Sequence, residues 1–583
     1  MNKDISSPEK LSISTEPNGT NNEPLAPVQP EEKPKRSALK IALIMFALGM
    51  AVFLAAVDIT IITTALPTIS EHFHSSAGYT WIGSSYLLAN SASTPIWGKI
   101  SDIWGRKPIL LLANVIFFIG SLIAGLSINI GMLIAARAIQ GIGGGGLIVL
   151  VNICISDLFS MRERGAYFGI IGGVWAIASS LGPVVGGAFT QRVSWRWCFY
   201  INLPLDGVAF LIIFFILDLH TPKTPLLDGL RAIDWLGSLS MVGGTLMLLF
   251  GLEVGGVSYP WSSAKVICLI VFGVLTICLF FVIEWKIAPY PLMPLPLFSH
   301  RSNLAALGVC FFHAFTFIAG SFYLPLYFQA VLGATPLLSG VYLLPTALSL
   351  SSIAIFAGIF IKKTGNYLPP IWFGLFLMTA GFGLFIDLSP TSSWAKIILY
   401  QIVAGIGVGP NFQSPLIALQ SMVAPRDIAT ATATFGFVRS LATAISVVIG
   451  NVVFQNEMAK KYSSLRAALG PELADALGGG SASANVRIVD ALPPAQKTVA
   501  RKAFADSLST MWIVYVVFSG VGLLVGFLIG KNVLSRQHQE TKTGLEGEKE
   551  KRREREEEKR ERRRSKVLGK EVGGDEVGKE GEA

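Results

Sequence analysis

Two residues of opposite charge, Asp58 and Arg137, lie inside apolar stretches that are long enough to cross a lipid bilayer. A charge at the bilayer centre costs roughly 2.5–3.5 kcal/mol on insertion scales, so charged residues there usually serve a function. Counted along their helices, Asp58 lies roughly 13 Å and Arg137 roughly 9 Å below the same membrane edge. At this similar depth the two side chains can pair, and the pair keeps the carboxylate ionised until a substrate or a movement separates them. A carboxylate that alternates between these states binds and releases a proton; the alternative is a static buried ion pair.

The composition of the chain requires membrane-spanning helices around these residues. Of 583 residues, 52% are apolar and 15% are charged, and the mean hydropathy is +0.56. A soluble domain carries roughly 25% charged residues. Moreover, 30 of the 85 charged residues lie at or beyond Lys531. This composition excludes a soluble enzyme, a secreted disulfide scaffold and a disordered chain, and it predicts a multi-spanning membrane protein.

The net charge of +9 does not indicate a nucleic-acid partner. The tail 531–583 holds 16 basic and 14 acidic residues whose signs interleave, as in a solvated helix or a disordered extension. We expect this tail to be dispensable, so that deletion after Arg536 leaves the function intact. The five cysteines form no CxxC pair, which indicates small core residues and no metal site.

A hydrocarbon core of roughly 30 Å takes about 20 residues of helix, and this length sets the number of spans. Fourteen spans are predicted, at 41–66, 80–97, 108–127, 131–156, 166–188, 197–218, 233–252, 264–284, 304–328, 338–361, 368–388, 396–419, 428–454 and 508–530.

The charges of the short loops predict how these spans are oriented. With the N-terminus inside, the inner loops hold twelve Lys and Arg residues and the outer loops hold three, with Lys265 at a boundary. Because cytoplasmic loops retain Lys and Arg, both termini are expected in the cytoplasm, and 455–507 is expected as one long outer loop. The plasma membrane is the expected location, with the vacuolar membrane as the alternative.

A weak internal repeat divides the fourteen spans. The loop Gly98–Lys107 and the later loop Gly358–Tyr367 both place a second glycine seven residues after the first. Six helices counted from each end leave two over, which predicts an all-α membrane protein with two six-helix bundles and two extra central helices. The predicted parts are an N-tail (1–40), a first bundle (41–218), a two-helix linker (219–303), a second bundle (304–530) and a C-tail (531–583). Repeated halves are typical of secondary transporters, and no Walker motif that could bind ATP is found.

Glycine and proline carry a second signal near the charged pair. A run of four glycines ends at Gly146, shortly after Arg137, and the fifth span holds Gly182-Pro183 and Gly186-Gly187. Such residues allow close helix packing and a local kink, as two bundles that approach and part would need. Ordinary tight packing without a gating role is the alternative.

With these motifs, the sequence resembles the major facilitator superfamily, specifically its fourteen-spanner drug:proton antiporter branch and the fungal multidrug and toxin efflux type. The resemblance covers about residues 45–530. It rests on the loop GxxxDxxGRK (Gly98, Asp102, Gly105, Arg106, Lys107), the fourth-helix RxxQG (Arg137, Gln140, Gly141), the antiporter motif (Gly182, Pro183, Gly186, Gly187), the first-helix stretch Ala56–Ile69 and the stretch Ser194–Pro204.

The resemblance implies roles for some of these residues. It implies proton coupling at Arg137, an inner gate at the GxxxDxxGRK loop and export at the antiporter motif. It also implies that Asp102 meets the positive end of the thirteenth span, near Asp427 and Ile428. The second copy of the loop lacks the acidic residue and the GRK ending, so the inner gate is expected to be asymmetric.

Polar residues on second-half spans are candidates for a substrate cavity. They are His313, Tyr327, Gln329, Asn411, Gln413 and Arg439. For each, the alternative is a hydrogen bond to a neighbouring helix. Arg439 has no acidic partner on its own span, so it either reaches a first-half carboxylate or faces the cavity and favours anionic or strongly polar substrates.

The leading hypothesis is a monomeric, proton-coupled secondary transporter that exports hydrophobic or amphipathic small organic molecules by alternating access. The cargo would be a toxin, a secondary metabolite or an antifungal drug; the proton gradient would be the energy source, and neither cofactor nor enzymatic activity is expected. The first alternative is an uptake or vacuolar carrier for a polar nutrient such as an amino acid or siderophore. The second is a membrane sensor or scaffold.

Overall fold

The computed structural model describes residues 37–560, except for 220, 257–258, 479–481, 483–484, 538–542, 555 and 558–559. Residues 1–36 and 561–583, which hold much of the two predicted polar tails, lie outside this described part. Within it, the regular structure is helical apart from one isolated bridge between Gly255 and Tyr259. Helices satisfy their own backbone groups, which a chain in lipid requires.

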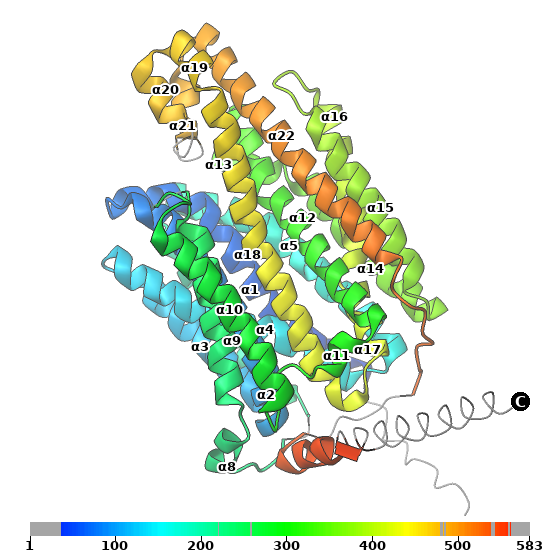
Figure 1. Ribbon diagram of the computed structural model, residues 1–583. Helices are drawn as coiled ribbons and strands as arrows, with labels where there is room; N and C mark the ends of the chain where they lie inside the picture. The colour runs from blue at the N-terminus through cyan, green and yellow to red at the C-terminus, as the bar shows by residue number, and fades with distance from the viewer. Residues whose placement is uncertain are drawn as a thin grey trace, which may run out of the picture.

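The first half of the chain is followed by a linker of two long and two short helices (Figure 1). The first half consists of α1 (Ala38–His72), α2 (Ser76–Trp104), α3 (Arg106–Gly125), α4 (Ile130–Leu158), α5 (Met161–Arg192) and the pair α6 (Trp197–Tyr200) and α7 (Asn202–Ile216). The linker consists of α8 (Leu226–Arg231), α9 (Trp235–Val254), α10 (Ala264–Lys286) and α11 (Pro296–Ser299).

The second half repeats this arrangement with more interruptions. It consists of α12 (Arg301–Ala330), α13 (Pro336–Val341), α14 (Leu344–Thr364), α15 (Leu368–Leu384), η1 (Phe385–Asp387), α16 (Trp394–Val408), η2 (Gly409–Phe412), α17 (Ser414–Ser421), η3 (Pro425–Asp427), α18 (Ile428–Lys460), α19 (Tyr462–Leu469), α20 (Pro471–Leu477), α21 (Val486–Ala491) and α22 (Pro494–Gly526). Residues 545–554 form a further helix, which we call the tail helix.

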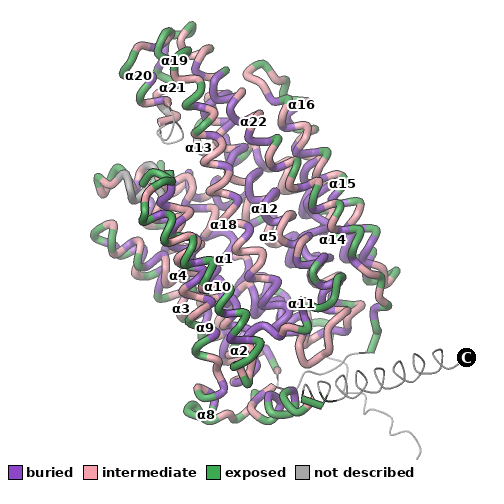
Figure 2. The backbone as a smooth tube through the Cα atoms, in the orientation of Figure 1, coloured by how far each residue is buried: buried purple, intermediate pink, exposed green. Residues whose placement is uncertain are grey.

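The fourteen predicted spans all coincide with single helices or with two or three consecutive helices. In the described part of the chain, thirteen segments have the length and hydropathy to cross a membrane. The fourteenth is α2, a 29-residue helix that packs along α4 and is richer in Ser, Thr and Asn. Much of α10 is exposed (green in Figure 2), and many of its exposed residues are large and apolar, such as Val271, Phe272 and Leu275. Only lipid can shield such a surface from water.

The segment 455–507 was expected as a long loop, and the structure differs. α18 continues to Lys460, three short helices follow, and α22 begins at Pro494. Its Ala-rich stretches are good helix formers, and buried Leu465, Leu469 and Ala474 give them an apolar face to pack.

The twelfth span is broken where Gly409 and Pro410 interrupt the helix. The amides of Leu416 and Ile417 bond to the carbonyl of Gln413 at 3.1 and 3.2 Å, which starts a new helix. The carbonyl of Phe412 is therefore available to a side chain. Broken helices of this kind often border binding sites in transporters.

The two halves meet along α2 with α18 and along α5 with α14. We call the end of the bundle where α1 begins and α22 ends the terminal face, and the opposite end the far face. Near the terminal face, α18 is buried on every side from Ile428 to Phe435. Toward the far face, its buried residues recur only every fourth position, at Ala442, Ser446 and Gly450, so one side alone is packed. The halves are therefore closed together at the terminal face.

Candidate functional site

Asp58 of α1 and Arg137 of α4 form an ion pair inside the first half. Both side chains are at most 1% exposed, so neither faces lipid. The second carboxylate oxygen, Oδ1, accepts hydrogen bonds from Gln140 Nε2 at 3.1 Å and from Asn202 Nδ2 at 2.9 Å. Gln140 also accepts a bond from Arg137 Nη1 at 2.9 Å and donates one to Ser121 Oγ at 2.8 Å. Three donors thus hold the carboxylate, and charge-assisted hydrogen bonds of this kind are stronger than neutral ones.

Aromatic rings and a carbonyl complete the surroundings of the guanidinium. Arg137 lies 4.5 Å from the centre of the Tyr86 ring and 5.9 Å from that of Phe199. Its Nε donates to the carbonyl of Ile82 at 3.1 Å. These contacts stabilise a buried cation by cation–π attraction and by a charge-assisted hydrogen bond. The guanidinium therefore keeps partners of its own if the carboxylate becomes neutral.

Two polar groups of this region were missed in the sequence. Asn202 lies in the stretch Ser194–Pro204, which was noted only as a family resemblance, and nothing in an apolar run says which way an amide points. Asp206, four residues on, is a second buried carboxylate within a predicted span. With its amide nitrogen turned toward it, Asn114 of α3 lies 2.9 Å from Asp206 Oδ2.

The loop between α2 and α3 is held by a chain of ion pairs. Arg106 pairs with Asp102 at 2.6 Å and, through Nε, with Asp157 of α4 at 2.7 Å. Gly105 has a φ of 91°, which favours glycine and lets α3 begin directly after α2. Lys107 takes no part in this chain and lies over the Phe214 ring at 5.8 Å.

Gly98 is a point of close approach between the halves at the terminal face. A Cβ built on it would lie 2.6 Å from Ala433 Cβ of α18. The expected contact of Asp102 with the start of α18 takes another form. Besides Arg106, the ion-pair partner of this carboxylate among the described residues is Lys551 of the tail helix, at 3.2 Å. Asp427 pairs with its neighbour Arg426 at 3.6 Å.

The glycines of α4 let three helices of the first half pack closely. A Cβ on Gly141 would overlap the carbonyl of Tyr86 on α2, and a Cβ on Gly143 would lie 2.6 Å from the amide of Phe117 on α3. The close packing leaves no room for a side chain at these glycine positions. It holds α4 in the place where Arg137 and Gln140 reach Asp58 of α1.

The motif on α5 divides between two partners. A Cβ on Gly182 or Gly186 would overlap α1, so these two glycines serve packing within the first half. A Cβ built on Gly187 would lie 3.6 Å from Leu337 Cα of the second half, and the Pro183 Cβ lies 3.0 Å from a Cβ built on Gly340. Pro183 and Gly187 are therefore the members of the motif that border the junction between halves.

Arg439 of α18 is half-buried and contacts the broken twelfth span. Its Nη2 donates to the free carbonyl of Phe412, and the guanidinium lies 4.9 and 5.0 Å from the ring centres of Phe412 and Phe435. Within the described part of the chain, no carboxylate lies at ion-pair distance from it. Of the two expectations for Arg439, a first-half carboxylate partner is therefore not what the structure shows.

His313 and Gln413 lie next to the same aromatic ring. His313 Nε2 bonds to the carbonyl of Val408 at 2.9 Å, and its ring meets that of Phe412 edge-on at 5.8 Å. Gln413 Nε2 reaches Asn152 Oδ1 of the first half at 3.5 Å. Together with Arg439, these residues form a cluster around Phe412 at the junction of the two halves.

The other three cavity candidates bond within the second half. Tyr327 donates to the carbonyl of Ser389 at 2.8 Å, and Gln329 donates to Ser339 Oγ at 3.1 Å. Asn411 is fully buried and donates to a backbone carbonyl of α15 at 3.2 Å. These contacts match the alternative of hydrogen bonding to a neighbouring segment.

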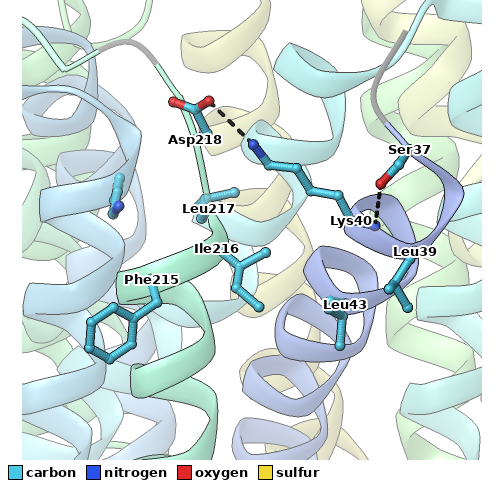
Figure 3. A pocket seen from close by; sticks show the side chains of 9 residues that line it. Ser37, Leu39, Lys40, Leu43, Phe215, Ile216, Leu217 and Asp218 are labelled. Atoms are coloured by element: carbon cyan, nitrogen blue, oxygen red, sulfur yellow. Dashed lines mark hydrogen bonds and ion pairs between the residues drawn. The ribbon is translucent and has the colours of Figure 1, made fainter.

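A surface pocket of about 460 Å³ lies elsewhere, at the terminal ends of α1, α3 and α7. Figure 3 shows Lys40 reaching Asp218 at 3.4 Å, with the side chains of Ile216 and Leu43 below the pair in this view. The pocket is open, and its lining does not include Asp58 or the Phe412 cluster. Its volume therefore does not identify the functional centre.

Comparisons with known proteins identify a family and a fold that the chain shares. The family model described as Major Facilitator Superfamily matches residues 48–447. The chain is 59% identical over 514 residues to the efflux pump dotC of Dothistroma septosporum, covering 88% of each chain. It is 58% identical over 514 residues to the MFS-type transporter ppz2 of Metarhizium majus, covering 88% of this chain and 89% of the relative.

A solved structure has the same fold. The bacterial homologue of the human lysosomal transporter Spinster, in an inward-facing and unoccupied conformation, superimposes with a TM-score of 0.54 at 15% identity. The match covers 86% of this chain and all of the other.

Proposed function

The chain belongs to the major facilitator superfamily, and we propose that it is a proton-coupled exporter of hydrophobic or amphipathic small organic molecules. The observation that carries the proposal is the buried carboxylate of Asp58, paired with Arg137 in the first half. Two further facts support export. The relative with 59% identity bears the name efflux pump, and the Gly-Pro motif of α5 resembles that of antiporters.

Asp58 would be the proton carrier. Protonation turns the carboxylate into a neutral acid and removes its attraction for Arg137, whose guanidinium keeps Gln140 and the Ile82 carbonyl. A buried cation without a counter-ion is costly, so protonation favours a conformation that gives Arg137 a new partner or water. Release of the proton restores the ion pair. Binding and release on opposite sides of the membrane would couple this change to the proton gradient.

From the loop charges, the terminal face would lie in the cytoplasm. The structure would then be the state that is closed to the cytoplasm, with Gly98 against Ala433 and the chain Asp157–Arg106–Asp102 behind them. Alternating access requires this contact to open and the junction at Pro183 and Gly187 on α5 to adjust. The roles of the loop and of α5 as moving gates are part of the proposal.

The cluster around Phe412 would hold the cargo. The rings of Trp175 and Phe317 lie 5.8 and 5.4 Å from that of Phe412, and His313 completes the aromatic surface. Flat apolar molecules can stack on such rings. Arg439, without a carboxylate partner among the described residues, would add attraction for a cargo with an anionic or strongly polar group.

We further propose that the transporter works as a monomer in the plasma membrane, with both termini in the cytoplasm. The proton gradient would be its energy source, without a bound cofactor. The alternative reading, uptake of a polar nutrient, predicts the opposite direction of net movement.

Transport of a lipophilic fluorescent dye tests the proposal. Cells that make the protein should accumulate less dye than cells that make Asp58→Asn, and a protonophore should abolish the difference. Asp218→Asn, a surface carboxylate that is 78% exposed, is the matched control and should behave like the unchanged protein. Equal accumulation with and without the protein across a broad compound panel would contradict export, and higher accumulation would indicate uptake.

A further inference from the structure

Part of the charged C-tail is docked on the terminal face. The tail helix, residues 545–554, lies beside the end of α2, as the red helix at the foot of Figure 1 shows. Before the helix, the amide of Gly544 donates to the carbonyl of Asp102 at 2.8 Å. One turn further, Glu548 pairs with Lys99, and Lys551 pairs with Asp102 at 3.2 Å. The tail therefore binds the loop that closes the two halves together.

The four charged groups of this contact are shielded from water. Lys99, Asp102, Glu548 and Lys551 are each at most 7% exposed, and Lys551 also reaches Glu548 at 2.7 Å. Each charge thus has an opposite charge beside it, which offsets the cost of burial. Lys99 in addition faces the ring of Tyr290 at 5.6 Å. A surface extension that touched the protein by chance would not bury two complementary pairs.

Ionisation strengthens this contact at both ends. Burial alone would raise the pKa of Glu548, but Lys99 and Lys551 outweigh it and hold that pKa well below its ordinary value. Burial alone would lower the pKa of Lys551, but Asp102 and Glu548 hold that pKa above its ordinary value. Both groups are therefore charged at neutral pH.

The tail helix also reaches the second half. Glu554 pairs with Arg426 at 2.6 Å, and Arg426 belongs to η3, directly before α18. The same helix thus contacts the end of α2 through Lys99 and Asp102, and the start of α18 through Arg426. These are the two segments that meet at Gly98 and Ala433. They cannot separate while all three ion pairs remain intact.

From this placement we propose that the tail helix braces the inner gate: Glu548 and Lys551 anchor it to α2, and Glu554 ties it to α18. The proposal rests on the proposed function, because it assumes that the two halves part at the terminal face during transport. Glu548, Lys551 and Glu554 are positioning residues, since they act on the equilibrium between conformations and not on the cargo or the proton. The brace favours the state closed to the cytoplasm and must release before that state opens.

Hydrogen exchange of the purified full-length protein in lipid nanodiscs tests the brace without cargo or proton gradient. Lys551→Glu should raise exchange at the gate segments 93–101 and 429–436 about tenfold, within the range typical of coupling between sites, and lower it in the far half of α18. Lys549→Glu makes the same charge change on the exposed side of the helix and should alter exchange neither at the gate segments nor in the far half of α18. A merely destabilised protein would exchange faster in all of these regions. A rise at the gate segments with a fall in the far half of α18 therefore identifies a shift between states.

Two charge exchanges keep the test decisive if Lys551→Glu folds poorly. Glu548→Lys should loosen the gate, and Lys99→Glu combined with Glu548→Lys should restore it. Glu554→Lys removes only the bridge to α18. Because that pair is partly exposed, exchange at the gate segments should rise at most a few-fold. Adding Arg426→Glu to Glu554→Lys should restore the pair and reverse this rise. If all these variants exchange like Lys549→Glu, the brace is refuted.

The outcome is independent of the transport assay. A gate that loosens in a protein without proton-driven efflux would refute the proposed function and leave the brace standing. Proton-driven efflux together with unaltered hydrogen exchange at the gate segments in every tail variant would refute the brace and leave the proposed function standing.

Discussion

Replacement of Asn202 by leucine should shift the pH dependence of transport upward. Asn202 Nδ2 donates to Asp58 Oδ1 at 2.9 Å, and leucine has a similar shape without a donor. The bond stabilises the ionised carboxylate, so its loss favours the protonated acid. A hydrogen bond to a charged group contributes about 1.5–3 kcal/mol, and 1.36 kcal/mol corresponds to one pH unit. The midpoint of the pH profile should therefore rise by about 1–2 units.

The assay uses proteoliposomes that hold the purified protein and a fluorescent cargo. Initial rates are measured while the pH on the proton-donating side is varied at constant pH on the other side. Asn114→Leu is the matched control, because Asn114 lies against Asp206 and not against Asp58. It should leave the midpoint in place even if the rate falls. A midpoint that stays unchanged in Asn202→Leu, while transport persists, would remove Asp58 from the proton-coupling step.

Three other outcomes follow from the same geometry. Gly182→Val should lower thermal stability by an amount equivalent to about 1–3 kcal/mol, because its side chain would overlap α1. Gly187→Ala is the control and should leave the melting temperature unchanged, because its Cβ would lie 3.6 Å from Leu337 Cα, an ordinary contact distance. Arg439→Gln should slow efflux of an anionic dye about tenfold more than efflux of a neutral dye of similar size, as paired efflux assays would detect. Protection of the tail helix from hydrogen exchange should be the same at about pH 5.5 and pH 8.5. The lowered pKa of Glu548 stabilises docking at every pH above its ordinary value of 4.5. The raised pKa of Lys551 stabilises docking at every pH below its ordinary value of 10.5.

The spans could be predicted because their signal is local. A stretch of about 20 apolar residues is visible in any sequence, and even α2, whose hydropathy is lower, stands between two loops that fix its limits. The breaks at Gly409–Pro410 and before Leu344 were not predicted, because a glycine or proline inside a membrane helix often leaves it continuous. The short helices of 455–507 were missed because each is too short for its apolar residues to show a helical periodicity.

The candidate site could be predicted only in part, because the direction of a side chain depends on helix rotation. Asp58 and Arg137 stood out by charge alone. Asn202, an amide, carries no such signal, yet it donates to the same carboxylate. For Tyr327 and Asn411 the sequence identifies a polar side chain but not its hydrogen-bond partner, so it cannot distinguish a cavity residue from one that bonds to a neighbouring segment. The packed structure makes this distinction, because it shows the backbone carbonyl that each side chain contacts.

The tail shows a further limit of sequence reasoning. Its alternating charges look like those of any solvated helix, because the residues that pair with them lie 449 positions away in the chain. Once folded, a line of alternating charges runs from the first half into the tail, through Asp157, Arg106, Asp102, Lys551, Glu548 and Lys99. Removing the tail would leave Lys99 without its partner at a site now 3% exposed, a change that a freely solvated extension could not cause. A tail that completes the pairing of buried gate charges belongs to the gate, which argues against its being dispensable.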